Sequence, residues 1–129
     1  MPDQALVVTA EVLRRLSDAK GALHFGPDAD GGYTGVHEAA TREEAELVFS
    51  RLIDTLVAEL PEHPSKAFVL EKFEAALNAL DLGDTEDRER AATHCQAIMD
   101  ILGIQSSDGV LNRWMYGPLL GSMLSARKP

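Results

Sequence analysis

Residues 41–61 read TREEAELVFSRLIDTLVAELP, and this stretch decides the fold class. Thr41 and Glu44 have the spacing of a capping box, in which each side chain bonds the backbone amide of the other residue. Between Ala45 and Leu60, apolar residues recur at three- and four-residue steps, which is the spacing of one face of an α-helix. Pro61 cannot continue a helix. The stretch therefore predicts a helix of about 20 residues, roughly 30 Å long.

The segments on either side carry the same apolar spacing and predict further helices. Serine, threonine, asparagine and aspartate are the usual N-cap residues, and glycine commonly follows the last turn. Gly21, Gly83 and Gly103 are expected to end three of these helices. The expected starts are Thr9, Pro64 or Ser65, Asp84 or Thr85, and Ser106 or Ser107, with one more short helix at Leu119–Ala126.

Residues 21–37 interrupt the helical pattern. The run from Gly26 to Gly32 consists of turn-forming residues, and a short β-hairpin near residues 24–37 is compatible with the sequence. Asp28 and Asp30 alternate as in a calcium loop, but Gly32 stands where a third ligand is needed, so we expect no metal. The sequence thus predicts one all-α domain over residues 1–129, a bundle of four to six helices with one Gly/Asp-rich loop.

The charge of the chain is strongly negative, at −9. Residues 38–90 hold 14 of the 21 acidic and six of the 12 basic residues, a net charge of −8. Direct binding of nucleic acid is disfavoured because it needs a basic surface. A negative field attracts basic proteins and speeds their encounter, although such charge also serves solubility alone.

The cysteine content and the absence of long apolar segments favour a cytosolic protein. Cys95 is the single cysteine and lies in an apolar helical pattern, so we expect a buried thiol rather than a reactive one. Asp3 stands where a signal peptide would carry basic residues, and no run approaches the length of a membrane span.

No catalytic motif is evident. A di-metal helical bundle would need Glu-x-x-His motifs, and none of the four histidines, His24, His37, His63 and His94, has an acid three positions before it. No serine lies in a nucleophile elbow, and no phosphate-binding loop follows a strand. We expect no cofactor and lean against an enzyme.

The leading hypothesis is therefore a binding module for a basic partner protein, most concretely an immunity or antitoxin-type inhibitor. An acidic inhibitor would associate quickly with a basic toxin. The expected binding surface combines the outer face of the 41–60 helix with the start of the helix capped by Asp84. Its candidate residues are Glu43, Glu46, Asp54, Glu86, Asp87 and Glu89.

Two segments near the C-terminus resemble the signature block of a small bacterial family known only as a domain of unknown function. They are Ile98–Ile104, which reads IMDILGI, and Ser106–Gly117, which reads SSDGVLNRWMYG. The resemblance covers about residues 43–117, with Val110 where leucine is usual, and leaves 118–129 as a C-terminal extension. It implies a compact helical domain and no activity.

The signature residues support two interpretations, a structural one and a functional one. Capping and helix anchoring would account for them structurally. A small ligand-binding or hydrolase domain would instead bring Asp100, Asp108, Asn112, Arg113, Trp114 and Tyr116 to one pocket. A third hypothesis is a structural homodimer joined through Leu119–Ala126, so the chain is expected to be a monomer or a homodimer.

Overall fold

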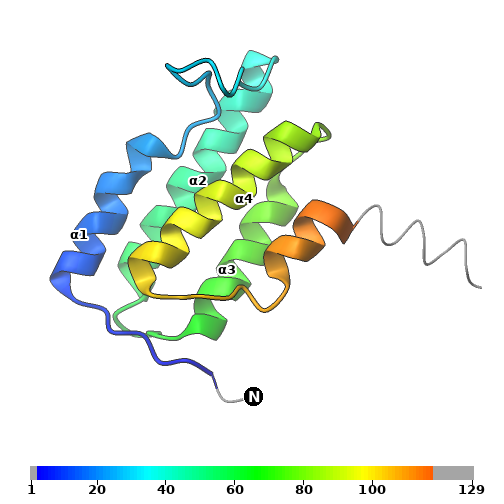
Figure 1. Cartoon of the computed structure of the whole chain (residues 1–129). Coiled ribbons are helices and arrows are strands. Elements are labelled where there is room, and N and C mark those ends of the chain that lie inside the picture. The colour runs from blue at the N-terminus through cyan, green and yellow to red at the C-terminus, as the bar shows by residue number, and fades with distance from the viewer. Residues whose placement is uncertain (1–2, 118–129) are drawn as a thin grey trace, which may run out of the picture.

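The computed structural model describes residues 3–117, and these form helices joined by short links and one long loop (Figure 1). The elements are α1 (Ala10–Ala19), the 3-10 helix η1 (Lys20–Ala22), α2 (Ala39–Glu59), α3 (Lys66–Ala79) and α4 (Thr85–Leu102). Residues 110–117 are also helical. α1 packs against α2 and α4, and α2 packs against α3. The predicted all-α fold is confirmed.

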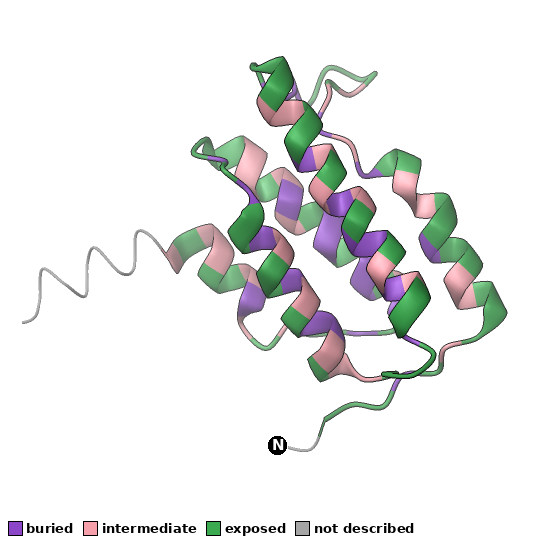
Figure 2. Ribbon diagram, turned by 180° about the vertical axis from the view of Figure 1, so that it is seen from behind, coloured by how far each residue is buried: buried purple, intermediate pink, exposed green. Residues whose placement is uncertain are grey.

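The buried residues lie mainly on the sides of the helices that face one another (Figure 2). α2 contributes the predicted apolar positions Ala45, Phe49, Leu52 and Leu56. Cys95 of α4 is fully buried, as expected, and burial raises the pKa of its thiol to about 12. A thiol held neutral in this way is a poor nucleophile. No described helix has the length and apolarity needed to cross a membrane.

Three predicted caps are confirmed by side-chain hydrogen bonds. The Thr9 hydroxyl accepts from the amide of Val12 at 3.1 Å, and the Ser65 hydroxyl accepts from Phe68 at 3.2 Å. The Asp84 carboxylate accepts from Glu86 at 2.8 Å, which satisfies one free amide at the start of α4. Gly103 then ends α4 in the left-handed conformation, with φ of 72°.

Two predicted helix boundaries are wrong. α2 begins two residues before Thr41, with Glu38 as N-cap and no side-chain cap bond, so the capping box does not form. Instead, the Thr41 hydroxyl lies 3.4 Å from the Glu38 carboxylate. Gly83 does not end α3, because that helix stops at Ala79 with Leu80 as its C-cap. Gly21 directly follows Lys20, the C-cap of α1, and lies within the short helix η1.

The 24–37 loop contributes to the core, contrary to what its composition suggests. Phe25 and Val36, together with Leu23 just before the loop, are buried and belong to the same apolar cluster as the helices. The described residues contain no strand here, so the predicted hairpin is wrong as secondary structure. Two backbone bonds nevertheless join the arms of the loop, from Val36 to Phe25 and from Asp28 to Tyr33, both 2.9 Å long.

Gly35 explains how the two arms approach so closely. Its φ is +87°, and a Cβ placed there would lie 2.9 Å from the backbone nitrogen of Pro27. An L-residue would therefore clash with the opposite arm as well as adopting an unfavourable backbone angle. The loop passes over one end of the bundle, close to the start of α4 (Figure 1).

The helix at 110–117 packs on α3 and α4 through apolar and polar contacts. Val110 is buried, while Leu111 and Trp114 pack partly against the core. The Ser107 hydroxyl accepts from the amide of Leu111 at 3.2 Å, so Ser107 stabilises the start of this helix as predicted. The predicted helix at Leu119–Ala126, and with it the proposed dimer contact, lies outside the described residues.

Candidate functional site

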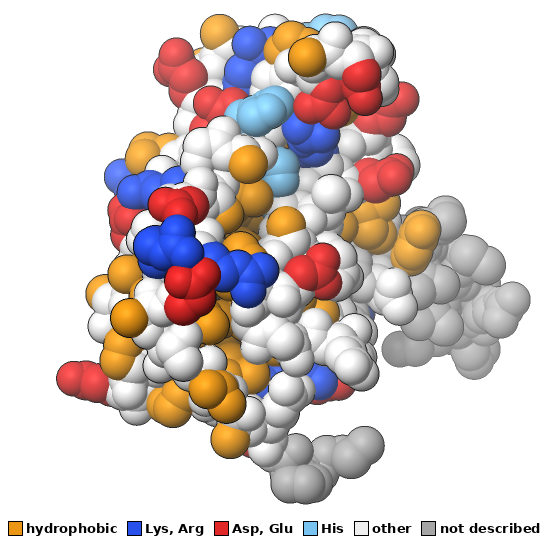
Figure 3. Space-filling view, turned by 60° about the vertical axis from the view of Figure 1, so that its left-hand side comes forward, with side chains coloured by type: hydrophobic (Ala, Val, Ile, Leu, Met, Phe, Trp, Pro, Cys, Tyr) orange, Lys and Arg blue, Asp and Glu red, His pale blue; other side chains and the backbone are white. Residues whose placement is uncertain are grey.

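An open pocket of about 250 Å³ lies between the 24–37 loop and the first three turns of α4. We call it the acidic pocket. Glu86, Glu89, Arg90 and Thr93 follow one another at helical spacing and therefore share a face of α4. Gly32 and Tyr33 line the pocket from the loop. Figure 3 shows several acidic side chains at the upper end of the molecule, with basic and histidine side chains among them.

Arg90 forms one wall of the acidic pocket and is held by an ion pair. Its two terminal nitrogens lie 2.6 and 2.9 Å from the two carboxylate oxygens of Asp28. This bidentate bond lowers the pKa of Asp28, because the guanidinium favours the charged carboxylate. The guanidinium also lies 4.7 Å from the centre of the Tyr33 ring. Asp28 thus neutralises Arg90 and leaves it little positive charge to offer the pocket.

Tyr33 fixes the opposite wall of the pocket. Its ring is buried, and its hydroxyl donates to the Asp87 carboxylate at 2.6 Å. Burial raises the pKa of Tyr33, and the bond to Asp87 adds to that shift. The hydroxyl therefore stays protonated at physiological pH and acts as a donor. Asp87 therefore holds the loop against α4 through its bond to Tyr33.

A second layer beneath the pocket anchors the loop to α2 and α4. His94 is buried, with Nε2 2.8 Å from the carbonyl oxygen of His24. Its ring meets Phe25 and Phe49 edge-on at centroid distances of 5.1 and 5.3 Å. Burial lowers the pKa of His94 to about 4, so the imidazole is neutral near pH 7 and Nε2 is the donor.

The six acids predicted to bind a partner do not form one surface, and some of them are already paired within the fold. Glu86 and Glu89 are exposed and line the acidic pocket. Glu46 accepts from the buried amide of Phe25 at 2.8 Å, and Asp87 is bonded to Tyr33, so both serve the fold. Asp54 pairs with Lys20 at 2.6 Å, and Glu43 is exposed in the second turn of α2. Only Glu86 and Glu89 therefore remain at the pocket as unpaired acids among residues 3–117.

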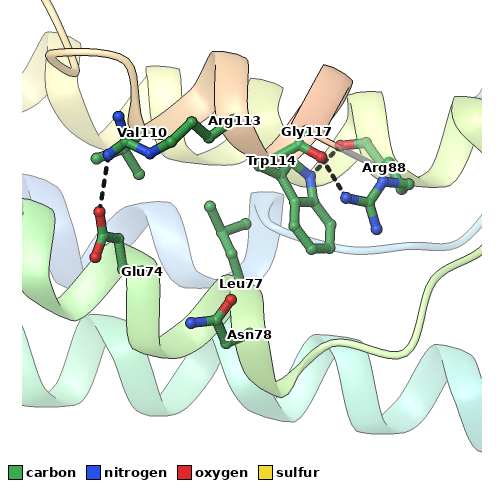
Figure 4. A pocket seen from close by; sticks show the side chains of 8 residues that line it. All are labelled: Glu74, Leu77, Asn78, Arg88, Val110, Arg113, Trp114 and Gly117. Carbon is green, nitrogen blue, oxygen red and sulfur yellow. Dashed lines mark hydrogen bonds and ion pairs between the residues drawn. The ribbon is translucent and has the colours of Figure 1, made fainter. Parts of the chain in front are cut away.

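A second pocket of about 390 Å³ lies between α3, the start of α4 and the helix at 110–117 (Figure 4). We call it the Trp114 pocket. It is lined by Glu74, Leu77, Asn78, Arg88, Val110, Arg113, Trp114 and Gly117. The indole N–H of Trp114 donates to the carbonyl oxygen of Arg88 at 2.9 Å, and Arg113 pairs with Glu74 at 3.1 Å.

The predicted convergence of the signature residues on one pocket is wrong. Only Arg113 and Trp114 line the Trp114 pocket. Asp100 is exposed and accepts from the Gln96 side-chain amide at 3.2 Å. Asp108 pairs with Lys66 at 2.9 Å, which ties the turn before the last helix to the start of α3. Asn112 and Tyr116 are exposed outside the pocket. The basis for a hydrolase using Asp100 is therefore lost.

Sequence reasoning missed Asp28, Tyr33 and Arg90 as residues of a site. Asp28 and Arg90 are 62 positions apart, and Tyr33 and Asp87 are 54 apart, so no local spacing connects them. The available signal was the presence of two basic residues, Arg88 and Arg90, among the acidic residues of the first two turns of α4. No group of three or more histidine, cysteine or acidic residues is placed to hold a metal ion within the described part of the chain.

This chain is similar to known proteins both in sequence and in structure. A family model described as "Domain of unknown function (DUF4844)" matches residues 7–118. A crystal structure of a DUF3571 family protein from Acinetobacter baumannii AYE matches with a TM-score of 0.77 and 32% sequence identity. The match covers 89% of this chain and 96% of that one. No curated protein matches significantly.

Proposed function

Because the chain belongs to the DUF4844 family, whose description states no activity, we propose a function from its own geometry: it binds a basic partner protein through the acidic pocket. The observation that carries the proposal is the position of Glu86 and Glu89. Both carboxylates line an open pocket, and within residues 3–117 neither has an ion-pair partner. A lysine or arginine of the partner would supply the missing charge.

The walls of the acidic pocket suit an inserted side chain. Tyr33 and Arg90 are held in place by Asp87 and Asp28, so the pocket is formed before a partner arrives. A preformed site loses less conformational entropy on binding than a flexible one. Thr93 adds a hydroxyl to the lining, and Gly32 lines the pocket from the loop. A guanidinium or ammonium group entering here would lie between two carboxylates and an aromatic wall.

The charge of the whole chain supports rapid encounter with such a partner. A net charge of −9 attracts a basic protein over a distance of about one Debye length, roughly 8 Å at physiological salt. The most concrete form of the proposal is an immunity-type protein that covers and neutralises a basic toxin. With one cysteine and no disulfide framework, we place this activity in the cytosol.

The proposal is tested by capturing partners with three forms of the chain. The first is the wild type, and the second carries Glu86→Lys and Glu89→Lys. The third carries Glu62→Lys and Glu71→Lys, which change the net charge equally at exposed positions away from the pocket. A specific partner should bind the first and third forms, lose affinity for the second, and dissociate as salt rises. Equal capture by all three forms would remove the acidic pocket from the binding surface.

A further inference from the structure

Arg88 is a half-buried cation that lacks a carboxylate partner among residues 3–117. Its guanidinium donates instead to two backbone carbonyls, that of Leu82 at 3.1 Å and that of Trp114. A guanidinium has five N–H groups, so these bonds leave others free. Burial lowers the pKa of Arg88, since no neighbouring negative charge offsets the loss of water. An anion bound beside Arg88 would supply the missing negative charge.

The apolar part of the Trp114 pocket consists of Leu77, Val110 and Trp114. Leu77 and Val110 are buried, and the indole of Trp114 extends from the last described helix toward α3 (Figure 4). The Arg88 guanidinium lies 3.6 Å from the centre of the indole ring, so the cation and the aromatic surface belong to the same wall. Asn78 adds an amide at the rim. A volume of about 390 Å³ lies within the range of small-molecule sites.

The charge of this lining differs in sign from that of the chain. Arg88 and Arg113 contribute two positive charges and Glu74 one negative charge, which leaves +1 in a protein of net charge −9. We propose that the Trp114 pocket binds a small aromatic carboxylate. Arg88 contacts its carboxylate, and the ring lies against Leu77, Val110 and Trp114. Arg113 and its partner Glu74 stand at the exposed edge of the site.

The single tryptophan of the chain gives a direct assay. In a ¹⁵N-labelled protein, the indole N–H of Trp114 produces one resonance, which we would follow while adding 2-naphthoate or the neutral 2-naphthamide. We expect saturable binding of the carboxylate with a Kd of about 1 mM, as is usual for a ligand of this size. The amide should bind at least about tenfold more weakly. Equal binding of the two probes, or binding of neither, overturns the proposal.

Two variants separate the site from general attraction of anions. Arg88→Gln should weaken the binding of 2-naphthoate about tenfold and leave the binding of the amide unchanged. Arg14→Gln, which changes an exposed arginine of α1, should alter the binding of neither probe.

Because Arg88 also contacts Trp114, a second variant is needed. Asn78→Phe alters an exposed position of α3 and should narrow the pocket for both probes. Unchanged affinity in Asn78→Phe, or equal loss in Arg14→Gln, would contradict the site. None of these residues lines the acidic pocket, so the outcome is independent of partner binding.

Discussion

Arg88 and Trp114 hold each other through two different interactions. The indole N–H of Trp114 donates to the backbone carbonyl of Arg88 at 2.9 Å, while the Arg88 guanidinium lies 3.6 Å from the centre of the indole ring. The residues are 26 positions apart, and the contact fixes the helix at 110–117 to the first turns of α4. The signature segment therefore has a structural role, because its tryptophan anchors this helix.

Trp114→Phe should destabilise the fold although it keeps an aromatic ring. The variant loses the indole N–H bond and weakens the cation–π contact, which together cost about 1–2 kcal/mol in the free energy of unfolding. Urea denaturation followed by circular dichroism measures this change. Tyr116→Phe, at an exposed neighbouring position, is the control and should have almost no effect. Similar losses in the two variants would contradict the anchoring role of Trp114.

Glu46→Ala should lower the free energy of unfolding by about 2 kcal/mol, the usual cost of removing a charged acceptor from a buried donor. The Glu46 carboxylate accepts from the amide of Phe25, a residue whose side chain is fully buried. Glu43→Ala, about one turn earlier on an exposed side of α2, is the matched control and should change stability little. If Glu43→Ala costs as much as Glu46→Ala, the loop anchor at Glu46 is wrong.

The helices could be predicted from the sequence because their signals are local. The caps Thr9, Ser65 and Asp84 each lie within three residues of the amides they bond, and the apolar spacing of α2 follows from its own residues. The start of α2 could not be predicted in this way. Ala39 and Ala40 extend the helix by two residues on the N-terminal side of Thr41, because alanine favours helical backbone. Thr41 is therefore inside the helix and cannot act as its N-cap.

The site could not be predicted because its contacts join distant segments. Phe25 and Val36 lie in a glycine-rich loop whose composition suggests exposure, yet both are buried against the helices. The sequence does not show that Glu46 reaches Phe25 across 21 positions. Glu86 and Glu89 were predicted as binding residues from charge alone, and the structure adds the pocket that they line.

Asp28→Asn should loosen the loop without unfolding the bundle. The variant loses the charge of the bidentate pair with Arg90, which joins the loop to α4. We expect the amides of Asp28 and Val36, which close the loop, to exchange with solvent at least about tenfold faster. Hydrogen exchange followed by NMR measures both rates. Asp30→Asn, at an exposed position of the same loop, should leave them unchanged, and an equal acceleration would assign the effect to loop charge in general.

Stability should fall as the pH drops from about 6.5 toward 4, because His94 is neutral in the folded chain. Its pKa is lowered from 6.5 to about 4, so the unfolded chain binds the proton more readily throughout this window. The loss should reach at most about 1.4 kcal/mol per pH unit. Asp28 contributes to the pH dependence at lower pH. Its pKa is lowered in the folded chain, so its charged carboxylate stabilises the fold at neutral pH, and this stabilisation is lost as the pH falls below the usual carboxylate range.

Urea denaturation at pH 7, 5.5 and 4.5 in three forms of the chain measures the contribution of His94. His94→Gln retains a donor for the His24 carbonyl but cannot be protonated, so its stability should depend less on pH than that of the wild type. His37→Gln changes an exposed histidine and should follow the wild type. An unaltered pH dependence in His94→Gln would mean that another group causes the loss.

The association rate of a captured partner, measured as ionic strength is raised, tests the central claim most directly. The account predicts that wild type associates fast at low salt and much more slowly at high salt. The Glu86→Lys, Glu89→Lys variant should associate at least about tenfold more slowly with a flatter salt dependence. The Glu62→Lys, Glu71→Lys control should stay close to wild type. If the two double variants show the same rates and the same salt dependence, the acidic pocket is not where the partner binds.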